Sequence, residues 1–381
     1  MIRKQRGKFG ITEMDTFISI AKRENNNRRG FLIVNRSQAK HIAADPCEAL
    51  RLFGALTDKV REKYRGISPE KLLTVGFAET ATAIGAAVAS GTGSRYIQTT
   101  RENVPGCEFL YFSEEHSHAT EQRLVRSGSD TLMGGVERVL LVDDEITTGK
   151  TILNIIDVLR REFPAVTKFS AVSLLNGMTA EHEHIFAQRG IDILYLHKLD
   201  NSGYEQAVRD IPADGLYVQP DISTPKVQLT RFDAGEFPDA RKPLDGGEYG
   251  CVCGSLCADI ADRLGFASGE TAVVIGTEEF MYPAIVLADE LKKRGITAVS
   301  HSTTRSPIAV SSDTSYPLHR RYELPSFYER ERRTFIYDLK KYDRAVILTD
   351  SRDIPGEAEN ALVNALVSAG NERVYLGRCS S

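Results

Sequence analysis

The chain has 381 residues, of which 41% are hydrophobic and 26% charged, and its formal net charge at pH 7 is −4. These values are ordinary for a globular chain with buried cores, and they exclude disorder, collagen and coiled coil as the main architecture. At about 150 residues per domain, the length predicts two or three domains.

Charge and cysteine content narrow the class of protein further. The near balance of 48 basic and 52 acidic residues gives no reason to expect nucleic acid or an anionic membrane as a partner. Six cysteines are too few for a disulfide framework. No apolar run approaches the ~18 residues that span a bilayer, so we expect a cytoplasmic protein.

Short apolar, β-branched runs alternate along the chain with segments of helical period. This alternation is typical of parallel sheets with crossover helices, and it predicts an α/β fold. Strands are expected at residues 31–35, 72–76, 95–99, 139–142, 169–175, 191–196, 272–275, 297–301, 344–348 and 373–376. Helices are expected at residues 46–64, 80–90, 151–162, 180–188, 251–264, 282–294 and 356–369.

Composition divides the chain into four parts. Residues 1–30 are polar and locally basic, which predicts an N-terminal extension. Residues 31–210 and 251–381 each have the α/β rhythm, and each predicts a domain. Between them, residues 211–250 contain five of the 14 prolines, interleaved with Gly and Asp. That composition predicts a connector rather than packed regular structure.

The two α/β segments look like diverged copies of one unit. TVGFAET at residues 74–80 corresponds to VIGTEEF at 274–280, and the TTR triplet at 99–101 corresponds to that at 303–305. Further on, VERVLLVDDEITTG corresponds to YDRAVILTDSRDIPG. Matches in the same order at nearly equal spacing predict a duplication; the alternative is two generic α/β units that share only their periodicity.

The most specific motif is VLLVDDEITTGKT at residues 139–151. A buried strand brings Asp143 and Asp144 to its carboxyl end, where ligands bind in open α/β sheets. The following turn opens a helix, whose backbone N–H groups and positive dipole end favour a phosphate. Two carboxylates followed by a phosphate cradle suit a sugar phosphate whose ring hydroxyls bond to the acids.

This motif resembles the phosphoribosyl-diphosphate (PRPP) signature of type I phosphoribosyltransferases of the orotate phosphoribosyltransferase kind. The resemblance implies a Rossmann-like parallel sheet in which Asp143 and Asp144 bind the ribose hydroxyls and contribute to a Mg²⁺ site. It also implies that the turn holds the 5′-phosphate. The residues that it assigns to PRPP binding here are Glu145, Ile146, Thr147, Thr148, Gly149, Lys150 and Thr151.

The family's pyrophosphate loop follows a strand and opens a helix. The residues with that placement are Phe77, Ala78, Glu79 and Thr80. Glu79 departs from the family pattern, because an acid that faces pyrophosphate needs a metal ion or a basic group between them.

Residues 101–138 lack strong periodicity and fit the mobile flap that closes over such sites. Within them, Glu115, His116 and His118 suit proton transfer or metal contact; the alternative is a polar surface turn. The stretch from residue 72 to 149 contains no lysine, so arginines such as Arg101 are the cations that it offers to pyrophosphate.

Over nearly its whole length the chain is also similar to a bacterial subfamily in which a phosphoribosyltransferase domain is followed by a TRSP domain. The shared segments are ETATAIG, EEHSHAT, VDDEITTGKT and the TRSP tetrapeptide at residues 304–307, in that order. This similarity implies a link to tellurite-resistance (Ter) stress operons and a role in making a nucleoside-like metabolite. Other operon-encoded proteins are then candidate partners.

Enzymes of the orotate type commonly work as homodimers in which basic residues of one subunit reach the other's pyrophosphate. Arg305, the counterpart of Arg101, precedes a Ser-Pro turn, and a guanidinium suits bidentate phosphate contact. We therefore expect an intrachain pseudo-dimer in which Arg305 points into the PRPP site of the first half. The alternatives are a local ion pair on the second domain and a homodimer of whole chains.

The expected activity is Mg²⁺-dependent pentosyl transfer from PRPP to a nitrogenous base, with release of pyrophosphate. The alternatives are a PRPP-sensing regulator without turnover and a nucleoside-processing enzyme on the same fold. The second half is expected to be degenerate, because Thr349 and Asp350 replace the acid pair and Asp353 in its turn would repel phosphate.

Overall fold

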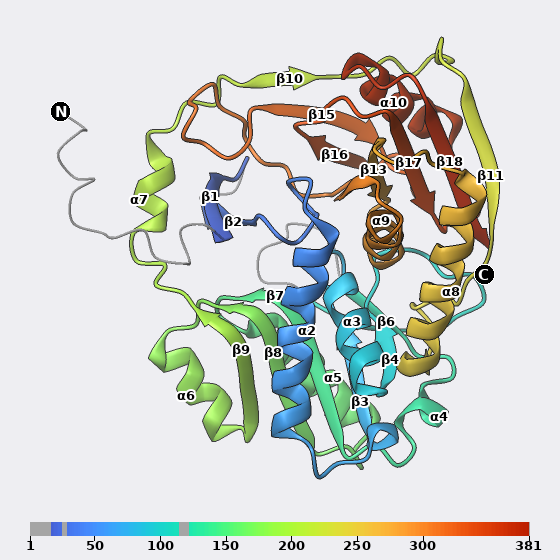
Figure 1. Ribbon diagram of the computed structural model, residues 1–381. Helices are drawn as coiled ribbons and strands as arrows, with labels where there is room; N and C mark the ends of the chain where they lie inside the picture. Colours follow the sequence, from blue (N-terminus) through green and yellow to red (C-terminus); the bar gives the residue numbers. More distant parts are fainter. Residues whose placement is uncertain (1–16, 25–28, 114–121, 381) are drawn as a thin grey trace.

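The computed structural model describes residues 17–24, 29–113 and 122–380. They form two parallel sheets, separated by a layer of helices (Figure 1). The α/β fold predicted from the sequence is therefore confirmed. No helix within the described ranges is long and apolar enough to cross a membrane.

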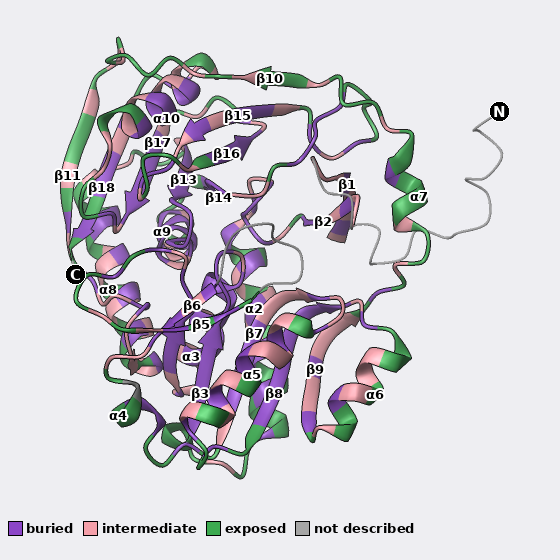
Figure 2. Cartoon of the chain, turned by 180° about the vertical axis from the view of Figure 1, so that it is seen from behind, coloured by how far each residue is buried: buried purple, intermediate pink, exposed green. Residues whose placement is uncertain are grey.

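The first sheet has the strand order β12-β4-β3-β7-β8-β9. Its parallel strands are β3 (Leu72–Gly76), β4 (Arg95–Gln98), β7 (Arg138–Ile146), β8 (Lys168–Asn176) and β9 (Ile191–Lys198), and β12 (Leu244–Asp245) is antiparallel to β4. Its helices are α2 (Pro46–Lys63), α3 (Thr82–Thr92), α5 (Lys150–Glu162) and α6 (Ala180–Gln188). Helices α2 and α3 cover one face, and α5 covers the other (Figures 1 and 2).

The second sheet has the order β11-β18-β17-β13-β14, and all its strands are parallel. The strands are β11 (Leu229–Glu236), β13 (Thr271–Gly276), β14 (Thr297–Ser302), β17 (Arg344–Thr349) and β18 (Val374–Ser380). The helices are α8 (Gly246–Leu264), α9 (Tyr282–Lys293) and α10 (Gly356–Ser368). Alternate residues of β13 and β17 pack against α8 and α9 on one face and against α10 on the other.

Smaller elements complete the described chain. β10 (Leu216–Val218), β15 (Arg320–Pro325) and β16 (Arg333–Tyr337) form a three-stranded sheet. β1 (Ile18–Lys22) pairs with β2 (Phe31–Asn35), and β5 (Phe109–Phe112) pairs with β6 (Gln122–Val125). The short helices are η2 (Pro69–Lys71), α4 (Ser129–Met133) and α7 (Tyr204–Arg209).

Residues 211–250, predicted as a connector without regular structure, differ from that prediction. They contribute β10, β11 and β12 to three different sheets. The five prolines of this segment lie between the strands, where no N–H is required for a ladder. The register shift between Asp233 and Gly235 shows that β11 also contains a bulge. The segment therefore connects the halves and is also part of both main sheets.

The predicted duplication is present in the topology. Strands β4-β3-β7-β8 of the first sheet have the same order as β14-β13-β17-β18 of the second. In each half an antiparallel pair, β5–β6 or β15–β16, comes between the second and third of these strands along the chain. Helices α2, α3 and α5 of the first half occupy the chain positions of α8, α9 and α10 in the second.

The two halves meet through equivalent helices in a crossed arrangement. Helix α2 packs against α9, and α3 packs against α8, so these four helices form the layer between the sheets (Figure 1). Each half also pairs one residue before its first helix with a strand of the other half: Ala44 pairs with Ser300 in β14, and Leu244 pairs with Tyr96 in β4. The two halves of the chain therefore pack against each other through equivalent elements.

Close packing of α3 on β3 positions the loop that joins them. A Cβ atom added to Gly85 of α3 would lie 2.6 Å from the Cα atom of Gly76, the last residue of β3. Only a residue without a side chain fits there, and the loop at residues 77–80 starts from this contact.

We predict that Gly85→Ala lowers the free energy of unfolding by about 1–3 kcal/mol, because the added methyl group overpacks this contact. Gly54→Ala in α2 is the matched control, since nothing lies within 4 Å of a Cβ added there. It should raise stability by about 0.5–1 kcal/mol through helix propensity. Chemical denaturation of both variants measures the difference, and an equal effect of the two would contradict the packing argument.

Candidate functional site

The acid pair lies at the carboxyl end of β7, in the middle of the first sheet. Residues 139–142 are buried, whereas Asp143 and Asp144 are half-buried. The Asp143 carboxylate accepts a hydrogen bond of 2.9 Å from the backbone N–H of Asp144. The backbone N–H of Phe77 donates to the carbonyl of Val142 at 3.0 Å, so the loop after β3 begins directly beside the acid pair.

The turn after β7 leads into α5, and the backbone N–H of Lys150 donates to Thr148 Oγ1 at 3.3 Å. Gly149 has a φ of 74°, and a Cβ atom there would lie 2.4 Å from the ring of Phe186. A side chain at Gly149 would therefore clash with Phe186. Helix α5 begins at Lys150, and its N-cap residue Gly149 provides no side-chain hydrogen bond. Such a helix start has N–H groups and a dipole suited to an anion. Thr147, Thr148 and Thr151 are half-buried and Lys150 is exposed.

The side chains of two residues assigned to PRPP binding contact other parts of the protein. The side chain of Ile146 lies in the hydrophobic core, so only its backbone faces this turn. Glu145 accepts a hydrogen bond of 2.6 Å from Arg29, whose guanidinium stacks 4.2 Å above the ring of Phe31. Burial raises the pKa of Glu145, and the nearby Asp144 adds to that effect.

Hydrogen bonds from two other segments fix the loop of residues 77–80. Phe77 and Ala78 are buried, and the Ala78–Glu79 peptide bond is cis. The N–H of Ala78 donates to Thr99 Oγ1 at 2.8 Å, and its carbonyl accepts from Gln122 Nε2 at 2.8 Å. The second half repeats the first contact, since Glu278 N–H donates to Thr303 Oγ1 at 3.0 Å.

Glu79 has the basic partners that its place in the loop requires. It accepts hydrogen bonds from the backbone N–H of Arg305 at 3.0 Å and from Arg305 Nε at 2.8 Å. The ammonium group of Lys40 lies 3.8 Å from the same carboxylate. Burial alone would raise the pKa of Glu79, but Arg305 and Lys40 outweigh it and hold that pKa below its usual value.

Arg305 contacts residues of the first half, and the groups that its side chain binds are carboxylates. Besides Glu79, its guanidinium contacts Glu102 at 3.4 Å and Glu279 at 3.1 Å. The three acids occupy its Nε, Nη1 and Nη2 atoms, so Arg305 is the centre of a buried ion-pair cluster. The second half has a reciprocal contact: Glu279 accepts from the N–H of Arg101 at 3.0 Å and from Thr100 Oγ1 at 2.7 Å.

Part of the predicted flap carries regular structure. Residues 101–138 include β5, β6 and α4, and Asn154 of α5 donates to the carbonyl of Ser113 at 3.0 Å. Glu115, His116 and His118 lie outside the described residues. Among the residues that are described, no group of three or more His, Cys, Asp or Glu side chains could by itself hold a metal ion.

The cluster around Arg305 also raises the pKa of one acid into the neutral range. Burial, together with the charges of Glu279 and Glu278, raises the pKa of Glu102 to about 7, although Arg332 and Arg305 oppose the shift. Arg332 bonds to both Glu102 and Glu278. Glu102 therefore changes charge near neutral pH inside the interface between the halves.

We predict that stability falls as the pH rises from about 4.5 to about 7, the ordinary and the raised pKa of Glu102. An acid with a raised pKa stabilises the folded state below its unfolded-state pKa, and this contribution is lost as the pH passes the folded-state value. Glu102→Gln should therefore melt about 2–4 °C above the parent at pH 8, with a smaller difference at pH 5. The control is Glu108→Gln, an exposed carboxylate nearby. A pH-independent difference would contradict this assignment.

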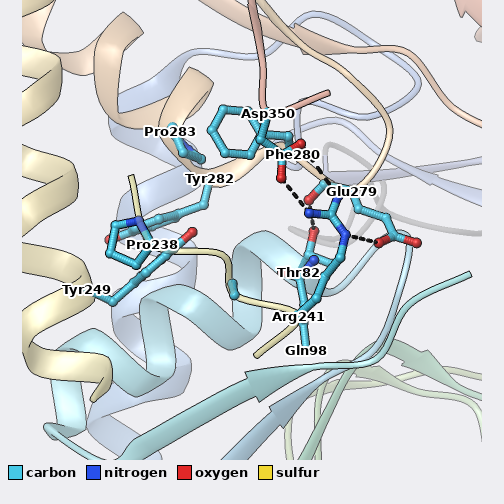
Figure 3. Close-up of a pocket in the computed structure, with 11 residues that line it drawn as sticks. Thr82, Gln98, Pro238, Arg241, Tyr249, Glu279, Phe280, Tyr282, Pro283 and Asp350 are labelled. Atoms are coloured by element: carbon cyan, nitrogen blue, oxygen red, sulfur yellow. Dashed lines mark hydrogen bonds and ion pairs between the residues drawn. The ribbon is translucent and has the colours of Figure 1, made fainter. Parts of the chain in front are cut away.

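In the second half, side chains of the protein itself fill the place that corresponds to this site. Asp350, the counterpart of Asp144, is bonded by the guanidinium of Arg241 and by Tyr328 Oη at 2.6 Å. Arg241 also contacts Glu279 at 3.3 Å (Figure 3). The cavity beside this group has a volume of about 10 Å³, which is room for one water molecule. A sugar phosphate does not fit there.

Lys40 and the role of Arg241 were missed by the reasoning from sequence. Both residues belong to segments without regular structure, and both contact residues that are distant along the chain. The usable signal is the duplication itself: Ala39-Lys40 and Ala240-Arg241 precede helices that begin after Asp45 and Asp245. Extending the alignment of the halves toward the N-terminus would have placed them one position apart.

Comparison with known proteins gives two family matches that together cover most of the chain. Residues 17–197 match the model of a phosphoribosyl transferase family. Residues 253–366 match the model of the TRSP domain, which lies C-terminal to that transferase domain. No curated protein sequence matches the chain.

Among solved structures, the chain is similar to adenine phosphoribosyltransferases. The enzyme from Leishmania tarentolae is 21% identical over 40% of this chain and 74% of that one, with a TM-score of 0.29. The enzyme from Trypanosoma brucei, solved with AMP, pyrophosphate and ribose-5-phosphate, is 15% identical over 51% and 80% of the two chains, with a TM-score of 0.34. The enzyme from Rhodothermus marinus is 16% identical over 49% and 96%, with a TM-score of 0.33.

Proposed function

Because the chain belongs to the phosphoribosyl transferases that carry a C-terminal TRSP domain, we propose that it moves a 5-phosphoribosyl group from PRPP to a nitrogenous base and releases pyrophosphate. The observation that carries the proposal is the geometry at the carboxyl end of β7. There, two half-buried acids precede a helix start without a side-chain cap, and the loop after β3 begins beside them.

Each part of this geometry suits one part of PRPP. Asp143 and Asp144 would accept hydrogen bonds from the ribose hydroxyls and stabilise positive charge that develops on the ribose during transfer. The turn from Thr147 to Thr151 would bind the 5′-phosphate through N–H groups at the start of α5. The loop from Phe77 to Thr80 would face the diphosphate, and Glu145 would stay with Arg29 behind the site.

Mg²⁺ fits this set of residues as a cofactor held jointly with the substrate. Magnesium in phosphate sites is bound by one or two carboxylates together with substrate oxygens, and Asp143 and Asp144 are half-buried carboxylates at the site. The described residues provide no larger metal cluster, which agrees with an ion that arrives with PRPP. When bound, Mg²⁺ would neutralise charge on the leaving pyrophosphate.

The remaining parts of the proposal concern organisation and context. We propose a transferase domain at residues 31–210, a TRSP-type domain at 251–381, a connector between them and an N-terminal extension at 1–30. We also propose a cytoplasmic enzyme that makes a nucleoside-like metabolite linked to stress and tellurite resistance. These statements are supported by the motifs at residues 139–151 and 304–307.

We predict that Asp143→Asn and Asp144→Asn each lower PRPP-dependent release of pyrophosphate by about 10²–10³-fold, the scale for loss of a group that stabilises transition-state charge. Both acids are half-buried at a strand end, so the variants should keep the parent's melting temperature. Asp353→Asn is the control, because Asp353 is exposed in the corresponding turn of the second half. Chelation of Mg²⁺ should abolish the activity of the parent.

The assay measures pyrophosphate formed from PRPP with a panel of purine and pyrimidine bases. Wild-type rates in both Asn variants would show that the acids do not form the site. PRPP binding without turnover for any base would favour the sensing alternative over an enzyme.

A further inference from the structure

Two basic residues lie in similar places in the two halves, five and four residues before the aspartate that caps the next helix. Lys40 precedes α2, and Arg241 precedes α8. The carbonyl of the alanine before each one is bound by the last strand residues of the opposite half. Ala39 accepts from Ser302 Oγ at 2.9 Å, and Ala240 accepts from the N–H of Gln98 at 2.8 Å. Each basic side chain contacts a loop of its own half: Lys40 contacts the loop after β3, and Arg241 contacts the loop after β13.

In the second half this basic residue closes the site. Arg241 bonds to Asp350, which stands where the first half has Asp144, and it also contacts Glu279 of the loop after β13 (Figure 3). The guanidinium thereby links the loop to the acid. The charge of Arg241 is thereby paired inside the protein.

In the first half the basic residue stays at the loop. The Lys40 side chain is only 6% exposed, and its ammonium group bonds to Thr80 Oγ1 and lies 3.8 Å from Glu79. An ammonium group has three N–H donors. The contacts of Lys40 within the described part of the chain involve the loop at residues 79–80 and do not include Asp144.

Lys40 is a cation beside this loop that can serve a diphosphate. The guanidinium of Arg305 is shared among three carboxylates, and the chain from residue 72 to 149 contains no lysine. The hydroxyl of Thr80 bonds to Lys40. Thr80 is half-buried, whereas the other residues of the loop are buried. A diphosphate that binds at Thr80 meets the ammonium group of Lys40 there.

We propose that Lys40 binds the diphosphate of PRPP and the pyrophosphate product, whereas Arg241, one position further along in the aligned second half, turns inward and closes the second site. The proposal deepens the proposed function and rests on it. It also gives the TRSP-type half a role in the site. Strand β14 fixes the segment that carries Lys40, because Ser302 bonds to Ala39 and Ser300 pairs with Ala44.

The test is calorimetric titration of the full chain with inorganic pyrophosphate and, separately, with PRPP, both with Mg²⁺ and without any acceptor base. Lys40→Met should weaken binding of both ligands by about 10- to 100-fold, the scale of a lost charged hydrogen bond. Lys168→Met, an exposed lysine at the start of β8, is the matched control and should change neither constant. Asp143→Asn should weaken the binding of PRPP.

The outcomes separate this inference from the proposed function. If the parent binds neither ligand, the proposed function fails. If the parent binds both and Lys40→Met binds them equally well, Lys40 is only an ion-pair partner of Glu79 and the inference is overturned. If Lys40→Met does not fold, Lys40→Gln takes its place, because an amide can still bond to Thr80. Failure of both variants to fold would assign Lys40 a structural role and would also overturn the inference.

Discussion

The reciprocal contact between Glu79 and Arg305 on one side and Glu279 and Arg101 on the other determines how the two halves fit together. The two acids follow β3 and β13, and their partners follow β14 and β4, the neighbouring strands in the other sheet. The Glu79–Arg305 ion pair is buried, and a buried ion pair that loses one partner costs about 3–5 kcal/mol. The crossed packing of α2 on α9 and α3 on α8 is the arrangement that brings all four residues together.

The two copies have diverged, so that residues at corresponding places now have different roles. The first half keeps two half-buried acids at the end of β7 and an ammonium group at its loop. The second half keeps one acid, Asp350, and bonds it to Arg241. One copy therefore carries the proposed ligand site, while the other uses its polar groups in contacts within the protein. Removal of the second copy would leave Glu79 without Arg305, beside the loop proposed for the diphosphate.

Sequence reasoning predicted the main elements because buried strands and amphipathic helices leave a strong local pattern, as at residues 72–76 and 139–151. It missed β10 to β12, because short strands among prolines have no such pattern. It placed Arg305 near the first half through the duplication, but it could not give the three carboxylates around the guanidinium. Those contacts join residues more than 20 positions apart, and they depend on how the helices cross.

The covalent link between the halves has a consequence for how activity depends on protein concentration. Two separate subunits dissociate on dilution, whereas partners joined in one chain keep a high effective concentration at any dilution. The loop at residues 77–80 receives Arg305 and the anchored Lys40 segment from such an interface. A cell that holds only a few copies of this protein would therefore still hold complete sites.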